Sequence, residues 1–178
     1  MSELEKYEAH IERLEKEYPR AMRNVYCGVS TPEGWYHIVE SLVRNIQHYV
    51  KWKRNSRARD LRRYRAAKKG REELIKWMNE SREVPASDWI VERCDEIMEA
   101  GIDKLVITPR VNHIEIHQIK EKFGGLRFYY QGGDSEISGM VRMAEAWADK
   151  TCEVCGNLGK SRSGGWVRTL CDEHAKKD

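Results

Sequence analysis

The residues best suited to chemistry lie near the end of the chain, in the segment TCEVCGNLGKSRSGGWVRTLCDEH. Cys152 and Cys155 are followed, after fifteen intervening residues, by Cys171 and His174. Two close pairs of ligands at this separation are typical of structural zinc sites. The sequence therefore predicts that these four side chains bind Zn²⁺. Because four protein ligands close a tetrahedral site, no position is left for an activated water.

Catalysis by a metal would need further groups. A nuclease built on such a module needs a second histidine beside the metal as general base, and His174 is the only histidine of residues 151–178. His113, Glu115 and His117 alternate along a predicted strand, so they could hold a second metal from one face. The isoleucines between them fit an ordinary half-buried strand with a polar exterior. We predict a protein that is not an enzyme, with a metal-dependent hydrolase as the alternative.

The second candidate site is a basic arm, residues 51–71. It holds eleven Lys or Arg against the single Asp60, a balance of +10, whereas the whole chain carries +3. A segment whose charges are nearly all positive favours binding of a polyanion. Each cation can neutralise a phosphate, and such contacts do not depend on the base sequence. The predicted partner is therefore DNA or RNA, bound non-specifically. The predicted contacts are Lys51, Lys53, Arg54, Arg57, Arg59, Arg62, Arg63, Arg65, Lys68, Lys69 and Arg71.

Two other interpretations of the arm stay open. It could contact an acidic host protein, together with the aromatic side chains of Trp52 and Trp77, and so inhibit or retarget that protein. It could also be a solvated helical spacer, although such spacers usually mix both signs of charge.

Helices are predicted where apolar residues recur every three or four positions. The first begins at the capping-box pair Ser2 and Glu5 and ends before Pro19. The second begins near Trp35 and could continue through the basic arm. However, cations fall on every side of that arm, so no face of it is expected to be buried.

Gly70 interrupts the helical pattern, and an apolar cluster follows in EELIKWM. A further helix begins at Ser87 or Asp88 and ends at Gly101, and it contains Cys94 as a buried hydrophobic residue. The last helix is capped by Asp134 or Ser135. Its predicted buried side is formed by Ile137, Val141, Ala144 and Ala148.

Between the helix that ends at Gly101 and the last helix, apolar and polar residues alternate, which is typical of strands. LVIT at 105–108, VNHIEIHQIKEK at 111–122 and LRFYYQGG at 126–133 suggest a hairpin or small antiparallel sheet that turns at Gly124 and Gly125. Alternation places the apolar residues of the last segment toward the core. The exposed candidates for binding are then Lys120, Lys122, Arg127 and Tyr129.

The predicted fold class is α+β. A mostly helical body at 1–150 carries a small antiparallel hairpin or sheet and the basic helical arm at 51–71, and a treble-clef-like zinc finger at 151–178 is its appendage. Five cysteines are an odd number, which disfavours a disulfide framework and favours metal ligation in the cytoplasm. No membrane segment is predicted, since no run approaches the ~18 apolar residues of a span. Pairing of long helices into a homo-oligomer stays open.

Four motifs also resemble a known group of proteins. GWYHIVESL, QIKEKFGGLRFYY, GMVRMAEAWADKTCEVCGNLGK and GWVRTLCDEH, in this order, resemble a family of small bacteriophage and bacterial proteins. The resemblance implies a phage or prophage accessory protein in the cytoplasm of a bacterial host, with a zinc site at Cys152, Cys155, Cys171 and His174. It implies no activity, and the basic arm lies outside these motifs.

Overall fold

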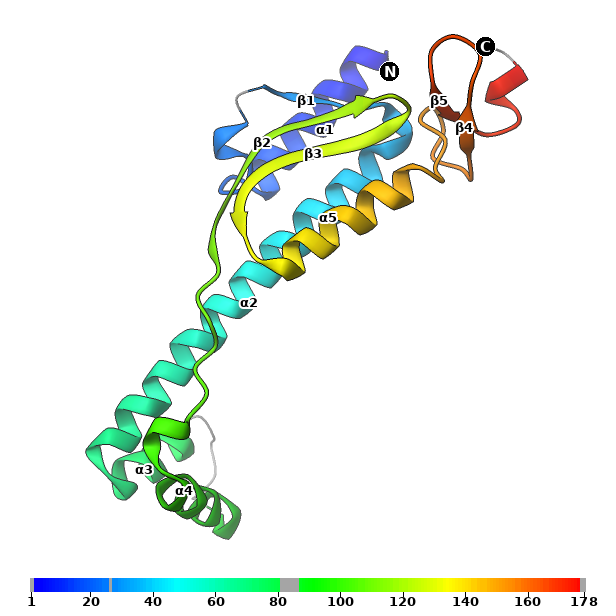
Figure 1. Cartoon of the computed structure of the whole chain (residues 1–178). Coiled ribbons are helices and arrows are strands. Elements are labelled where there is room, and N and C mark those ends of the chain that lie inside the picture. The colour runs from blue at the N-terminus through cyan, green and yellow to red at the C-terminus, as the bar shows by residue number, and fades with distance from the viewer. Residues whose placement is uncertain (1, 26, 81–86, 177–178) are drawn as a thin grey trace. The chain divides into compact units, whose positions relative to one another are not determined.

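The computed structural model describes residues 2–25, 27–80 and 87–176 (Figure 1). The chain combines helices with small sheets and has a cysteine and histidine cluster near its C-terminus, as predicted. It divides into two compact units, Met1–Tyr49 with Asn112–Asp178 and Val50–Val111. The sequence also predicts a domain boundary at residue 150, between the body and the zinc finger. That boundary stays a prediction. Within the described residues, no helix is long and apolar enough to cross a membrane.

The elements follow the order expected from the sequence, with additions. The helices are α1 (Glu3–Glu17), α2 (Tyr36–Lys69), α3 (Arg71–Glu80), α4 (Asp88–Ala100) and α5 (Ser135–Ala148). The strands are β1 (Val29–Ser30), β2 (Asn112–Lys122), β3 (Gly125–Gly133), β4 (Lys160–Arg162) and β5 (Arg168–Leu170). Short 3-10 turns are η1 (Met22–Asn24), η2 (Glu33–Trp35), η3 (Ile102–Lys104) and η4 (His174–Lys176).

The predicted helix ends agree with the structure. The Ser2 side chain accepts from the Glu5 backbone, and the Glu5 carboxylate accepts from the Ser2 backbone, so the capping box of α1 is confirmed. α2 continues through the basic arm to Lys69, and Gly70 separates it from α3. Ser87 is the N-cap of α4, and Asp134 is the N-cap of α5.

The first unit contains a three-stranded sheet. β2 and β3 are antiparallel, and β1 adds in parallel beside β2, in the order β1-β2-β3. The turn consists of Phe123 and Gly124, both with positive φ, and Gly125 already pairs with Lys122. The turn is therefore one residue earlier than predicted. β1 was not predicted, because two residues carry no periodicity.

α5 packs antiparallel to the first part of α2 in this unit (Figure 1). Near the start of α5, the Tyr49 hydroxyl donates to the Asp134 carboxylate over 2.8 Å. Near its end, the rings of His37 and Trp147 meet edge to face, with centroids 5.5 Å apart. The buried side of α5 is the predicted one, with Ile137, Val141, Ala144 and Ala148.

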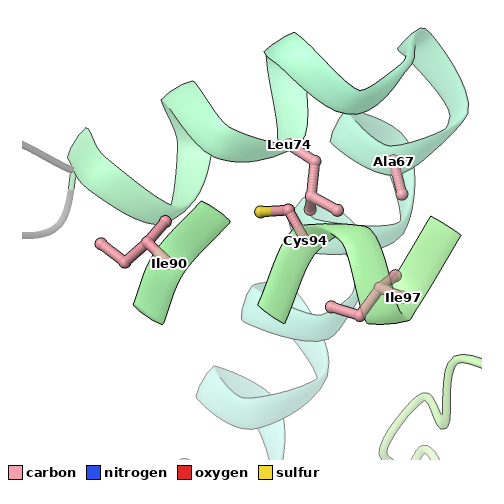
Figure 2. Close-up of a cluster of buried hydrophobic side chains, with 5 residues drawn as sticks. All are labelled: Ala67, Leu74, Ile90, Cys94 and Ile97. Atoms are coloured by element: carbon pink, nitrogen blue, oxygen red, sulfur yellow. The ribbon is translucent and has the colours of Figure 1, made fainter. Parts of the chain in front are cut away.

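The second unit has its own apolar cluster, formed by the end of α2 with α3 and α4. Figure 2 shows Leu74 of α3 facing Cys94 of α4, with Ala67 of α2 nearby. Cys94 is fully buried, and its sulfur lies 3.5 Å from the Met78 sulfur, which confirms it as a small hydrophobic residue.

The segment 105–111 is not a strand, contrary to the prediction for LVIT. The Thr108 backbone N–H donates to the Asp60 carboxylate over 2.9 Å, and the Thr108 carbonyl accepts from Arg57 over 2.9 Å. These backbone groups are satisfied by helix side chains, so they need no neighbouring strand.

His10 of α1 is a buried titratable group, only 2% exposed. Its ring stacks on Tyr36 with centroids 4.0 Å apart, and its Nδ1 lies 3.1 Å from the Glu40 carboxylate, which also accepts from Arg13. Burial lowers the pKa of His10 below its ordinary 6.5, although Glu40 opposes the shift. The folded environment of His10 therefore favours the neutral imidazole.

We expect acid to destabilise the protein through His10. Because the folded pKa lies below the unfolded one, its contribution is present above pH 6.5 and is lost as pH falls through the folded value. Between about pH 7.5 and 5.5, the free energy of unfolding should fall less in His10→Phe than in the parent, by up to about 1.4 kcal/mol per pH unit. Urea unfolding at several pH values measures this, and parallel curves for the two proteins would contradict it.

Candidate metal centre and basic helix face

The predicted ligands are brought together at the end of the first unit. The ligand atoms of Cys152, Cys155, Cys171 and His174 all lie within 4.8 Å of one another. The Sγ atoms of Cys155 and Cys171 are 3.8 Å apart, and His174 Nδ1 lies 3.6 Å from Cys152 Sγ and 3.1 Å from Cys171 Sγ. The four residues can therefore hold a metal ion.

The first ligand pair lies in a tight turn directly after α5. The Gly156 N–H donates to the Cys152 carbonyl over 2.9 Å, and Gly156 has a positive φ that favours glycine. Burial raises the pKa of the Cys152 thiol, but backbone amides, those of Cys171, Cys155 and Val154 first, outweigh it and lower the pKa to about 6. The turn thus favours a thiolate, the form in which cysteine binds metals.

The second pair follows the β4-β5 hairpin. Its strands are antiparallel, with Ser161 opposite Thr169, and they return the chain to the first pair. Cys171 comes directly after β5, and His174 begins η4. The Ala175 N–H donates to the Cys171 carbonyl over 3.0 Å, so the last turn is hydrogen-bonded across the ligands.

Two hydrogen bonds connect the segment that carries the ligands to η2. The buried Trp35 indole donates to the Thr151 carbonyl over 2.8 Å, and the Gly34 N–H donates to the Glu153 carbonyl over 2.9 Å. A Cβ at residue 34 would lie 2.2 Å from the Cys152 carbonyl oxygen. Only glycine permits this approach.

A second attachment joins the segment to the β2-β3 turn. The Thr169 hydroxyl donates to the Gly124 carbonyl over 2.7 Å. The Glu153 carboxylate, 6% exposed, accepts from Arg168 over 2.5 Å and from the Thr169 backbone over 3.3 Å. A paired carboxylate of this kind can be buried at tolerable cost. The sequence shows these residues but carries no signal that pairs them.

The alternative metal site of the sequence analysis is not assembled. In the part of the chain that the structure describes, the cluster at Cys152 is the one group of three or more potential ligands brought close together. His113, Glu115 and His117 follow one another along β2, where residues two apart lie about 7 Å from each other. Register shifts on both sides of Glu115 further break their alternation.

The basic arm has a buried face, so the expectation that it has none was wrong. Ser56 is 6% exposed and Ala67 is fully buried. Asp60 and Arg63 lie between them at helical spacing, on the same side of α2. Burial raises the pKa of Asp60, but hydrogen bonds from Thr108 outweigh it and lower the value. Small side chains and one satisfied carboxylate thus allow a charged helix to pack.

Several predicted nucleic-acid contacts are engaged within the second unit. Arg57 donates to the Thr108 carbonyl, Arg63 lies 3.8 Å from the Asp60 carboxylate, and Arg71 forms ion pairs with Asp95 and Glu72. The amine of Lys68 lies 5.4 Å from the centre of the Tyr64 ring, and that of Lys53 lies 5.9 Å from the centre of the Trp52 ring.

The opposite side of the helix is a cationic face. At 100° per residue, its members fall within a sector of roughly 80°, on the side away from Ser56 and Ala67. All are exposed, and within the described ranges none forms an ion pair with a carboxylate. They extend along about 27 Å of helix. The cationic face consists of Lys51, Arg54, Arg62, Arg65 and Lys69.

Comparison of the chain with protein-family models, with curated proteins and with solved structures yields no match. The function must therefore be inferred from the two sites themselves.

Removing a ligand tests whether the cluster holds metal. In Cys155→Ser we expect the metal content to fall from one ion per chain and the unfolding temperature to drop by roughly 10 °C. Because the segment is bound to Trp35, exchange of the amides around residues 34–38 should also accelerate. Elemental analysis and hydrogen exchange measure these effects. Cys27→Ser, also an exposed cysteine, is the control and should keep its metal. Equal metal content in the two variants would contradict the site.

Gly34→Ala tests the attachment to η2. The added methyl would overlap the Cys152 carbonyl, so we expect a loss of about 3 kcal/mol or more in the free energy of unfolding. Gly139→Ala is the matched control, since a Cβ there meets nothing within 4 Å in helix α5 and should stabilise by about 0.5–1 kcal/mol. Urea unfolding of both variants decides. A Gly34 variant as stable as the parent would show that the attachment is dispensable.

Proposed function

We propose that this protein binds nucleic acid non-specifically through the basic arm, as a zinc-stabilised accessory protein of a phage or prophage, and that it is not an enzyme. The observation that carries the proposal is the cationic face of α2, where Lys51, Arg54, Arg62, Arg65 and Lys69 are exposed together opposite the packed side. The phage origin rests on the resemblance of the sequence motifs.

Zinc is the proposed metal. Three cysteines and one histidine suit Zn²⁺, and with bonds of about 2.3 Å two tetrahedral thiolates lie about 3.8 Å apart. The separation of Cys155 and Cys171 supports this choice. The order of cysteine turn, β4-β5 hairpin and ligand-bearing η4 is consistent with a treble-clef-like finger. Because all four ligands are protein side chains, we assign the ion a structural role.

Charge favours nucleic acid over the acidic host protein. A protein surface mixes charges and apolar groups, whereas phosphates form a regular row of negative charge. The cationic face is likewise of one sign along about 27 Å. Such a face neutralises phosphates and releases their counterions, which gives binding that is strong at low salt and indifferent to sequence.

Salt dependence tests this proposal. For labelled duplex DNA, we expect log affinity to fall steeply with log salt, and the double variant Lys51→Gln with Arg54→Gln should reduce that slope by about 2. The control, Arg93→Gln with Lys104→Gln, removes the same charge from the second unit outside the cationic face and should leave the slope unchanged.

Absence of binding at low salt would sink the proposal. Affinity purification would then test the alternative. If a partner protein is still retained after nuclease treatment, and is not retained by the Lys51 and Arg54 variant, we would assign an acidic host protein as the partner.

A further inference from the structure

A groove lies beside the basic arm within the second unit. It is formed between α2 and α3 and has a volume of about 680 Å³. An open cavity of this size can admit a ring system together with its substituents. Its lining combines aromatic, cationic and polar side chains: Trp52, Asn55, Ser56, Arg59, Arg62, Trp77 and Glu80.

The two tryptophans of the groove differ in how they are held. Trp77 is partly buried and packs against the apolar cluster of the unit. Trp52 is 53% exposed, and the amine of Lys53 lies 5.9 Å from the centre of its ring. A half-exposed indole with a cation close by is suited to stacking of a planar, anionic ligand.

Cations outnumber carboxylates around the groove, which favours an anionic ligand such as phosphate. Arg59 and Arg62 line it, and both are exposed. A smaller hollow adjoins it through Arg62, Trp77 and Glu80. That hollow is lined further by three cations, Arg65, Lys69 and Lys76, and by Ala66 and the carboxylate Glu73. Glu80 is the carboxylate of the main groove, and it can accept hydrogen bonds from the exocyclic amino groups of bases.

We propose that this groove binds an unpaired base of single-stranded nucleic acid, with the base stacked on Trp52 and the adjoining phosphates on Arg59 and Arg62. The inference rests on the proposed function and narrows its ligand. In a duplex, both faces of each base are already covered by neighbouring bases, so only the cationic face can act. In a single strand the base faces are accessible, and the groove adds stacking to the phosphate contacts.

The test compares a labelled single strand of mixed sequence with the duplex formed from the same strand and its complement. We expect Trp52→Ala to weaken single-strand binding by roughly 5-fold to 150-fold, as loss of one stacked base does. Duplex binding should change by no more than about 2-fold. Trp52→Phe keeps an aromatic plane and should restore most of the single-strand affinity.

Trp89→Ala is the matched control, because Trp89 is equally exposed, lies in the same unit and does not line the groove. Its single-strand affinity should stay within about 2-fold of the parent. If Trp52→Ala behaves like Trp89→Ala, or weakens both probes equally, the stacking inference is overturned while salt-dependent binding of both probes still supports the proposed function. If neither probe binds at low salt, both are overturned.

Discussion

The structure of the first unit depends on the junction between residues 34–35 and residues 151–153. The Trp35 indole and the Thr151 carbonyl are 116 positions apart in the chain, and both are buried. Closing so long a loop has a large entropic cost, which one hydrogen bond does not offset. The bond persists because each side adjoins a regular helix, with Trp35 directly before α2 and Thr151 three residues after the end of α5.

The cysteine and histidine cluster and this junction share one segment of the chain. An ion held by the four ligands would fix the turn from Cys152 to Cys155, and the same turn presents the Glu153 carbonyl to Gly34. Conversely, η2 and the β2-β3 turn restrict the segment before any metal arrives, so less entropy is lost when the ligands converge. The segment that carries the ligands is therefore hydrogen-bonded to two other parts of the first unit, η2 and the β2-β3 turn.

Local signals allowed the sequence to predict much of this arrangement. The capping box at Ser2, the stop at Gly70, the buried stripe of α5 and the ligand set are each encoded within a few neighbouring residues. Two of the failures have the same cause, which is partners distant in sequence. Residues 105–108 (LVIT) do not form a strand because Thr108 bonds to Asp60 of α2. Ser56 is buried by residues that the spacing of apolar residues along the chain does not identify.

Packing accounts for one side of the basic arm but not for the charges on its other side. Ser56 and Ala67 bury one side of α2, and Asp60 offsets part of the positive charge there. On the other side, pairs such as Arg62 with Arg65 and Arg65 with Lys69 repel at helical spacing, at about 0.2–0.5 kcal/mol each. Acidic partners on the same helix would have removed that repulsion. The polyanion binding that we propose would remove it too, and would give a physical reason for a face that folding by itself disfavours.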